Sequence, residues 1–309
     1  MLDMQKTIPK HPFPLNKVGI TNKKIFIKLK GDHKIPAIVN ANVDLDIQNK
    51  GVHMSRHIES IQEVINLPNE SNIINIPSKI VKELLKRHEY SKRAEVDIQA
   101  DIEYETKTPV SKRKSSEFAT VILKAVGFRR DGKSEILRKI GIKLYGMSVC
   151  PCGQNMVKEF AKKNLKELGY PFDNIKKILA AVPIATHNQR CSIEATIESK
   201  NESFSIDIQD FIQLINNSFS SETYSLMKRQ DEFSLILKAH KKPLFVEDSA
   251  RNLIINMLKK FGQYLSNEDK ITIKQENFES IHKHNAFVEF SSSIGELKKK
   301  MGSYFMFVS

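Results

Sequence analysis

The stretch AEVDIQADIEY, residues 94–104, places an apolar side chain at every second position. Two further runs of the same kind follow at residues 117–128 and 136–147. Such alternation is typical of a β-strand with one buried face. The basic segment 111–116 predicts a hairpin tip, and Asp131-Gly132 is a strong short-turn signal. These runs therefore predict three long strands in antiparallel order.

Other elements are expected on both sides of these strands. Residues 1–22 contain three prolines and predict an extended arm. Ser55 is expected to cap a helix that ends at Pro68. The remaining expected strands are 23–30, 35–47, 192–199, 231–239, 270–275, 285–290 and 304–308, and the remaining expected helices are 78–88, 156–168, 171–181, 208–215 and 247–265.

The order of these elements predicts an α+β fold with helices on one face of antiparallel sheet. Residues 1–130 are expected to form a first module with the N-terminal arm. Residues 131–309 repeat the strand-and-helix plan with insertions, as a second module. Exposed sheet edges favour oligomerisation by edge pairing.

Composition narrows the class of protein. The 309 residues are 40% hydrophobic and 28% charged, which suits a soluble globular chain. No run approaches the ~20 apolar residues of a membrane span, and the N-terminus lacks a signal-peptide core. Only three cysteines are present, which favours a reducing cytoplasm. The net charge of +13 favours a polyanionic partner, either nucleic acid or a phosphorylated small molecule, although much of it is solvated lysine.

Two of the three cysteines, Cys150 and Cys152, stand one residue apart where a strand-like run meets a helix. This spacing is unfavourable for a disulfide and differs from the Cys-x-x-Cys of redox and zinc motifs. Two small residues behind a turn would explain the pair equally well.

Four other polar clusters contain metal-ligand side chains, and three of them have simple structural explanations. A loop histidine, a surface turn and a helix cap would account for residues 186–190, 228–232 and 245–248. Residues 279–284 crowd a carboxylate and two imidazoles, which is uncommon outside sites. Together the clusters suit zinc or ferrous iron with an open position for water. Such a metal would generate hydroxide at neutral pH, and the positive charge would suit a phosphorylated substrate.

Six motifs in this order resemble the GTP cyclohydrolase IB family, over about residues 15–290. They are KGVHMSR (50–56), SVCPC (148–152), THNQR (186–190), KRQDE (228–232), FVED (245–248) and ESIH (279–282). The resemblance implies a tunnelling fold with two modules per chain. It also implies a homotetramer or dimer with interfacial sites, and no membrane or nucleic-acid partner. In the implied reaction, water activated by a metal adds to C8 of GTP, the imidazole ring opens, formate leaves and a dihydropterin forms.

The resemblance also implies roles for individual residues. Cys150, Cys152 and His187 are catalytic by position, with Cys152 exchanging a proton with the purine. Glu247 anchors the guanine edge, and the ribose and triphosphate contacts rest on charge as much as on resemblance. The implied metal ligands are Cys150, His187, Glu232, Glu279 and His282. The implied ribose and triphosphate residues are His53, Ser55, Arg56 and Arg190, with Lys228 and Arg229 behind them.

The connection of about 34 residues between Cys152 and His187 is similar to the archaeal MptA branch. That branch implies Fe²⁺, with Zn²⁺ or Mn²⁺ as alternatives, and a 7,8-dihydroneopterin 2′,3′-cyclic phosphate for methanopterin or folate biosynthesis. The alternative product is 7,8-dihydroneopterin triphosphate. Cys191 is expected to be structural.

Three rival readings remain. A basic nucleic-acid-binding protein with a structural metal would bind in a salt-dependent manner, but its ligands would be paired locally. A related pterin or deazapurine enzyme would keep the fold and change the chemistry. A non-catalytic protein would not require Cys150, Glu232, Glu279 and His282 together.

Overall fold

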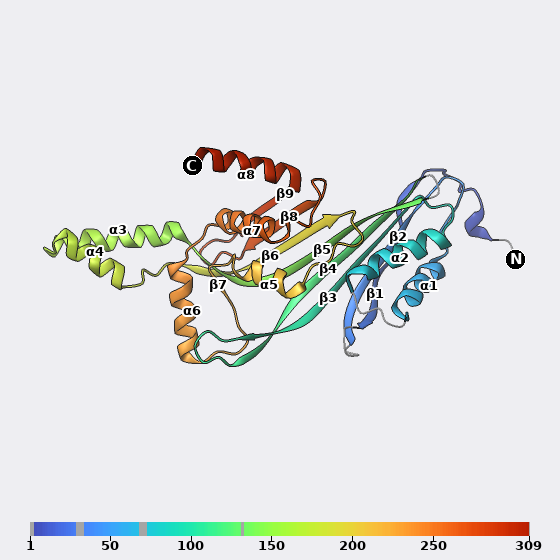
Figure 1. The fold of residues 1–309 in the computed structure, drawn as a ribbon. Helices are drawn as coiled ribbons and strands as arrows, with labels where there is room; N and C mark the ends of the chain where they lie inside the picture. The colour runs from blue at the N-terminus through green and yellow to red at the C-terminus, as the bar shows by residue number, and fades with distance from the viewer. Residues whose placement is uncertain (1–2, 29–33, 68–72, 131–132, 309) are drawn as a thin grey trace.

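One antiparallel sheet runs through the molecule, in a computed structural model that describes residues 3–28, 34–67, 73–130 and 133–308 (Figure 1). Within these residues the sheet has nine strands in the order β1-β2-β3-β4-β5-β6-β8-β9, and β7 pairs with β5. The strands are β1 (Leu15–Lys28), β2 (Lys34–Leu45), β3 (Arg93–Lys107), β4 (Lys114–Arg130), β5 (Lys133–Val149), β6 (Asn188–Ser199), β7 (Ser221–Glu222), β8 (Lys270–Asn277) and β9 (Ala286–Ser293).

The three long runs predicted from period-two alternation are β3, β4 and β5, which confirms that part of the sequence analysis. In β3 the apolar positions 94–102 are buried and the intervening glutamine and acids from 99 onward are exposed. The hairpin tip predicted at 111–116 is closed by a hydrogen bond from the N–H of Thr108 to the carbonyl of Arg113, 3.0 Å. The predicted turn at Asp131-Gly132 lies outside the described residues.

Two helix pairs pack against the sheet. Helices α1 and α2 cover the strands of the N-terminal half, and α5 and α7 cover those of the C-terminal half (Figure 1). One continuous apolar core lies beneath them, from Val39 in β2 to Ile273 in β8. The short helices are η1 (Met4–Lys6) and η2 (Ile73–Asn75), and the longer ones are α1 (Met54–Ile65), α2 (Ile76–Arg87), α3 (Pro151–Glu167), α4 (Phe172–Ala181), α5 (Ile208–Asn216), α6 (Arg229–Lys241), α7 (Val246–Phe261) and α8 (Ile294–Val308).

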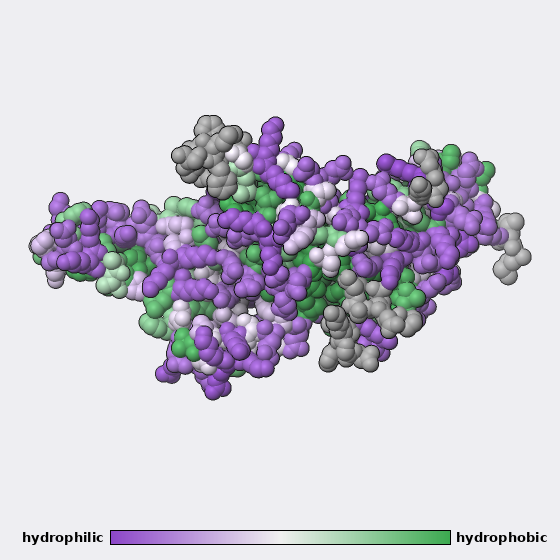
Figure 2. Space-filling view, viewed as in Figure 1, coloured by the Kyte–Doolittle hydropathy of each residue, from purple (hydrophilic) through white to green (hydrophobic). Residues whose placement is uncertain are grey.

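Helices α3 and α4 form a hairpin that projects away from the sheet (Figure 1). None of the residues of α3 is buried. The surface of the hairpin shows hydrophilic and hydrophobic residues side by side (Figure 2). The predicted helices 156–168 and 171–181 are confirmed, with α3 beginning five residues earlier, at Pro151.

Two predicted strands are helices in the structure. Residues 231–239 lie in α6, where the buried side chains Asp231, Leu235 and Ala239 recur every four residues and Phe233 is exposed, so burial follows the helical period instead of alternation. Acidic residues in its first turn and Lys238, His240 and Lys241 in its last turn complement the helix dipole. Residues 304–308 end α8, whose start carries a Ser-x-x-Glu cap in which the N–H of Glu296 donates to Ser293 Oγ at 3.3 Å.

The N-terminal predictions need three smaller corrections. The arm is shorter than residues 1–22, since β1 already begins at Leu15 and pairs with β2. Helix α1 has His53 at its N-cap, and Ser55 lies exposed inside its first turn. Helix α2 begins at Ile76, because Pro77 fits the first turn, where its missing N–H is not needed.

The sheet continues from β4 to β5, so the proposed modules 1–130 and 131–309 share one sheet and remain a prediction. In the part of the chain that the structure describes, we find no helix with the length and apolarity needed to span a membrane.

Candidate functional site

The two neighbouring cysteines lie where β5 ends and α3 begins, as the sequence predicts. Cys150 is the N-cap of α3, and its Sγ accepts a hydrogen bond from the N–H of Gly153 at 3.4 Å. Pro151 occupies the first helical turn, which its fixed φ favours. Cys150 is half-buried, Cys152 is exposed and both are free thiols. The thiol of Cys150 is therefore held by a helix start rather than by a disulfide.

His187 and Glu279 lie beside this turn and are joined through Gln189. His187 Nδ1 is 3.1 Å from Gln189 Oε1, and Gln189 Nε2 donates to Glu279 Oε1 at 2.9 Å. His187 Nδ1 and Glu279 Oε2 are 3.9 Å apart. The backbone N–H of Cys150 donates to the carbonyl of His187 at 3.3 Å. A thiol, an imidazole and a carboxylate thus gather at one end of the sheet.

Gly153 allows this close approach. A Cβ at this position would lie 2.3 Å from Thr186 Oγ1 and 3.4 Å from His187 Cδ2. A side chain there would press the start of α3 away from residues 186 and 187. The missing side chain therefore lets the turn that holds Cys150 lie against the edge of the His187 ring that contains Cδ2.

Two of the predicted substrate-binding residues, Glu247 and Arg190, lie at the end of the sheet that carries Cys150. The N–H of Leu244 donates to the carbonyl of Val149 at 3.1 Å, which ties the start of α7 to the end of β5. Glu247 is exposed in the first turn of α7. Arg190 on β6 is also exposed, with its guanidinium 5.4 Å from the centre of the Tyr145 ring. Both side chains are open to a ligand from solvent.

His282 lies in the loop between β8 and β9 and is exposed. Its ring stacks on His284 with a centroid distance of 5.0 Å. The loop starts at Glu279, but the structure does not place His282 on His187 or on Glu279. Glu279 and His282, which the sequence analysis predicts to be a pair, are thus close in sequence, but within the described residues their side chains do not contact each other.

Glu232 lies at the opposite end of α6 from the cysteines. Gln154 Nε2 in α3 donates to the carbonyl of His240 near the end of α6, at 2.7 Å. Glu232 precedes His240 by eight residues, about 12 Å along a helix. Its side chain is exposed, and Lys228 and Arg229 at the start of α6 are exposed as well.

The predicted triphosphate residues of α1 lie at the far end of the sheet. Val43 pairs with Ala94 in a row of strand partners that reaches Ile136, at the beginning of β5. Ile136 and Val149 are thirteen positions apart on β5, about 40 Å. Here His53 Nε2 is 3.3 Å from Asp3 Oδ2, Arg56 donates to the carbonyl of Arg87 at 2.8 Å, and Ser55 is exposed.

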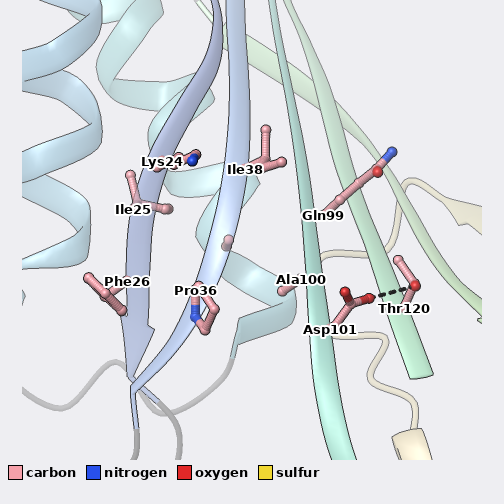
Figure 3. Close-up of a pocket in the computed structure, with 10 residues that line it drawn as sticks. Lys24, Ile25, Phe26, Pro36, Ile38, Gln99, Ala100, Asp101 and Thr120 are labelled. Atoms are coloured by element: carbon pink, nitrogen blue, oxygen red, sulfur yellow. Dashed lines mark hydrogen bonds between the residues drawn. The ribbon is translucent and has the colours of Figure 1, made fainter. Parts of the chain in front are cut away.

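A hollow of about 580 Å³ lies on the sheet across β1 to β4 (Figure 3). Ile25, Phe26 and Ile38 line it, and its carboxylate, Asp101, accepts a hydrogen bond from Thr120 Oγ1 at 2.7 Å. It contains no residue of the six sequence motifs. It is therefore not the candidate site.

The donor atoms near Cys150 suit a borderline transition metal, because they combine thiolate, imidazole and carboxylate. His187 Nε2 has no hydrogen-bond partner in the ranges that the structure describes, which leaves one ring nitrogen available. Across the same ranges, however, no three His, Cys, Asp or Glu side chains are arranged to hold a metal ion. Within the described residues, Cys150, His187 and Glu279 are thus of suitable types for metal ligands, but their side chains are not arranged around one metal position.

Gln189 is a site residue to which the sequence analysis assigned no role of its own. A signal for Gln189 was present, since it shares the inward face of β6 with Cys191 and Ile193. A glutamine at an inward strand position needs buried hydrogen-bond partners.

Comparison with protein families gives one match over most of the chain. Residues 1–288 match the family described as type I GTP cyclohydrolase folE2. A GTP cyclohydrolase MptA of Methanobrevibacter smithii is 40% identical over 306 residues, covering 97% of each chain. The protein of that name from Methanocaldococcus jannaschii is 38% identical over 309 residues, covering 98% of each chain.

Solved structures with the same fold include two uricases. That of Bacillus fastidious has a TM-score of 0.52 at 10% identity, covering 94% of this chain and 96% of its own. That of Arthrobacter globiformis has a TM-score of 0.50 at 10% identity, covering 90% and 93%. These similarities show the tunnelling fold and confirm the predicted fold class.

Proposed function

This chain belongs to the type I GTP cyclohydrolase family, and from that premise we propose that it converts GTP at the end of the sheet that carries Cys150. The reaction opens the imidazole ring of guanine, releases formate and yields a 7,8-dihydroneopterin phosphate for pterin biosynthesis. The observation that carries this proposal is the gathering of Cys150, His187 and Glu279 from three motifs far apart in the sequence.

The family is metal-dependent. We assign Fe²⁺ as the metal, held by Cys150, His187 and Glu279, with Glu232 and His282 as further ligands; Zn²⁺ and Mn²⁺ are the alternatives. When bound, such an ion supplies a Lewis acid that makes hydroxide available at neutral pH. The free Nε2 of His187 and the half-buried thiol of Cys150 are the donors that the structure presents to it.

The remaining side chains orient the nucleotide. Glu247 is exposed on the first turn of α7, where its two carboxylate oxygens can accept from N1–H and the 2-amino group of guanine. Cys152, exposed one residue beyond Pro151, exchanges a proton with the purine. Arg190 contacts the phosphates as a planar, permanently charged donor.

The complete site takes residues from more than one copy of the chain. His53, Ser55 and Arg56 lie at the end of the sheet where β5 begins, whereas Cys150 follows its other end, about 40 Å along the strand. A second copy would bring its own residues to the first copy's cysteines. The outer strands β1 and β9 end the sheet and offer edges for pairing between copies. We therefore propose a homotetramer or dimer with interfacial sites, acting in the reducing cytoplasm, where its three thiols stay free.

The favoured product is 7,8-dihydroneopterin 2′,3′-cyclic phosphate. Two observations support it: relatives named MptA that are about 40% identical, and the α3–α4 hairpin that forms the long connection between Cys152 and His187. The triphosphate remains the alternative product.

The test is anaerobic incubation of the purified protein with GTP and Fe²⁺, followed by mass spectrometry and fluorescence of the oxidised pterins. Formate with a cyclic phosphate and pyrophosphate supports the full proposal, whereas formate with a triphosphate changes only the product. Cys150→Ala is the control and should abolish turnover. Intact GTP with Fe²⁺, Zn²⁺ and Mn²⁺ alike would refute the cyclohydrolase assignment.

A further inference from the structure

We infer that Gln189 is a positioning residue that fixes which nitrogen of His187 carries the proton, and so leaves Nε2 free to bind a metal ion. The inference rests on the proposed function for its purpose, since it names the ring nitrogen that faces the metal. It concerns the hydrogen bonds between His187, Gln189 and Glu279, and it is tested without measuring turnover.

The direction of each hydrogen bond follows from the chemistry of the three side chains. The Glu279 carboxylate can only accept, so the amide nitrogen of Gln189, 2.9 Å away, donates to it. The amide oxygen must then face His187 Nδ1, 3.1 Å away. An amide oxygen cannot donate, so Nδ1 carries the proton. In a neutral imidazole, Nε2 is then the unprotonated nitrogen.

Burial favours this one orientation of the Gln189 amide. Gln189 as a whole residue is 7% exposed, and the side chains of His187 and Glu279 are 16% and 11% exposed. Water competes poorly for the amide, and a reversed amide would set its oxygen against a carboxylate. The backbone of Gln189 is fixed as well, because it pairs with Ser148 in the β5–β6 ladder.

The same hydrogen bond also orients the carboxylate of Glu279. Gln189 uses Glu279 Oε1, whereas Oε2 stays 3.9 Å from His187 Nδ1 and free of the amide. The other edge of the His187 ring, at Cδ2, faces Gly153, whose N–H holds the sulfur of Cys150. Partners of this kind, which orient a metal ligand from behind, typically change metal affinity by about 10–100-fold when removed.

Two substitutions separate positioning from simple packing. Gln189→Met keeps length and burial but can neither accept from Nδ1–H nor donate to Glu279. Gln189→Glu keeps an acceptor for Nδ1–H and loses the donor to Glu279. The matched control is Gln275→Leu, because Gln275 is also buried, on β8, and its amide nitrogen donates to Asn277 and not to His187 or Glu279.

The first readout is the tautomer of His187 in the metal-free protein, from long-range ¹H–¹⁵N spectra of histidine-labelled samples above neutral pH, with His187→Gln for assignment. We expect the proton on Nδ1 in the wild type, in Gln189→Glu and in Gln275→Leu, and a shift toward Nε2–H in Gln189→Met. A wild-type ring protonated at Nε2, or a tautomer that Gln189→Met leaves unchanged, overturns the inference.

The second readout is the affinity for Fe²⁺ alone, measured anaerobically against a competing chelator. Gln189→Met should bind about 10–100-fold more weakly than the wild type and Gln275→Leu. Equal affinity in all three also overturns the inference. A wild type that shows the Nδ1–H tautomer and binds Fe²⁺ but leaves GTP intact would sink the proposed function and leave this inference standing.

Discussion

The buried carboxylate of Asp231 accepts two hydrogen bonds from Ser111, from its N–H at 2.8 Å and from its hydroxyl at 2.6 Å, across 120 positions of chain. The N–H groups of Val110 and Lys228 also donate to this carboxylate, at 2.9 and 3.0 Å. Asp231 thereby fastens the tip of the β3–β4 hairpin to the first turn of α6. It also fixes the position of its neighbour, Glu232.

Asp231→Ala should therefore destabilise the protein strongly, because it leaves four donors without their acceptor. We expect the midpoint of thermal unfolding to fall by several degrees. Asp173→Ala is the matched control, since Asp173 is an exposed acid in the first turn of α4. Equal melting temperatures for the two variants would show that the link contributes nothing to stability.

A second prediction concerns two buried histidines at the other end of the sheet. The rings of His57 and His88 are fully buried with centroids 4.6 Å apart. Burial, and then the nearby His57, Arg56 and His53, lower the pKa of His88 from 6.5 to about 3. Burial also lowers the pKa of His57. In the unfolded chain both rings take up protons near pH 6.5.

The contribution of these two neutral histidines to the free energy of unfolding should thus be fully present above about pH 6.5. It should be lost as the pH drops toward 3, because the unfolded chain binds protons at a higher pH than the folded chain does. The slope is about 1.4 kcal/mol per pH unit for each such histidine. Urea unfolding at pH 7 and at lower pH measures it. His88→Gln should flatten the dependence, whereas His11→Gln, at an exposed position, should not. An unchanged slope in His88→Gln would contradict the assignment.

The sequence was most informative where one face of a strand is buried, since a period of two is then enforced by the core. It failed at α6, where the apolar residues alternate along 231–239 although only Leu235 and Ala239 are buried, and where Asp231 and the charges at both ends favour the helix. The start of α8, in contrast, is marked in the sequence by Ser293 and Glu296, a Ser-x-x-Glu pattern that is typical of a helix start.

The site was predictable where its residues share one end of one chain. Cys150, His187 and Glu279 are found together, because strand register brings the ends of β5, β6 and β8 side by side. The order of the motifs along the sequence does not give their separation in space, so the positions of Arg56 and Glu232 away from Cys150 could not be predicted from it.

The third prediction concerns Gly146 on β5. A Cβ there would lie 2.3 Å from the ring of Phe219, which is 2% exposed and belongs to the packed core. Gly146→Ala should therefore cost about 1–3 kcal/mol, the usual range for an overpacked core. At Gly51 the nearest atom, Gln5 Cγ, would lie at 3.6 Å, so Gly51→Ala is the control and should be nearly neutral. Chemical denaturation compares them, and equal stability would refute the steric argument.

The last prediction tests whether the site is shared between copies. Cys150 and Arg56 lie at opposite ends of the sheet of one chain, which are about 40 Å apart along β5. If one site needs both, each must come from a different copy, and Cys150→Ala and Arg56→Ala should each be inactive alone. Oligomers assembled from both variants would contain some sites with both residues intact, so turnover of GTP should partly recover.

The control for this experiment is a mixture of Cys150→Ala with His187→Ala. These residues meet at the same end of the same chain, so every mixed site would lack one of them and should stay inactive. Mixed assembly is verified by native mass spectrometry with one variant carrying a mass label. Mixed oligomers of Cys150→Ala and Arg56→Ala with no recovery would show that Arg56 does not complete a site that contains Cys150 from another copy.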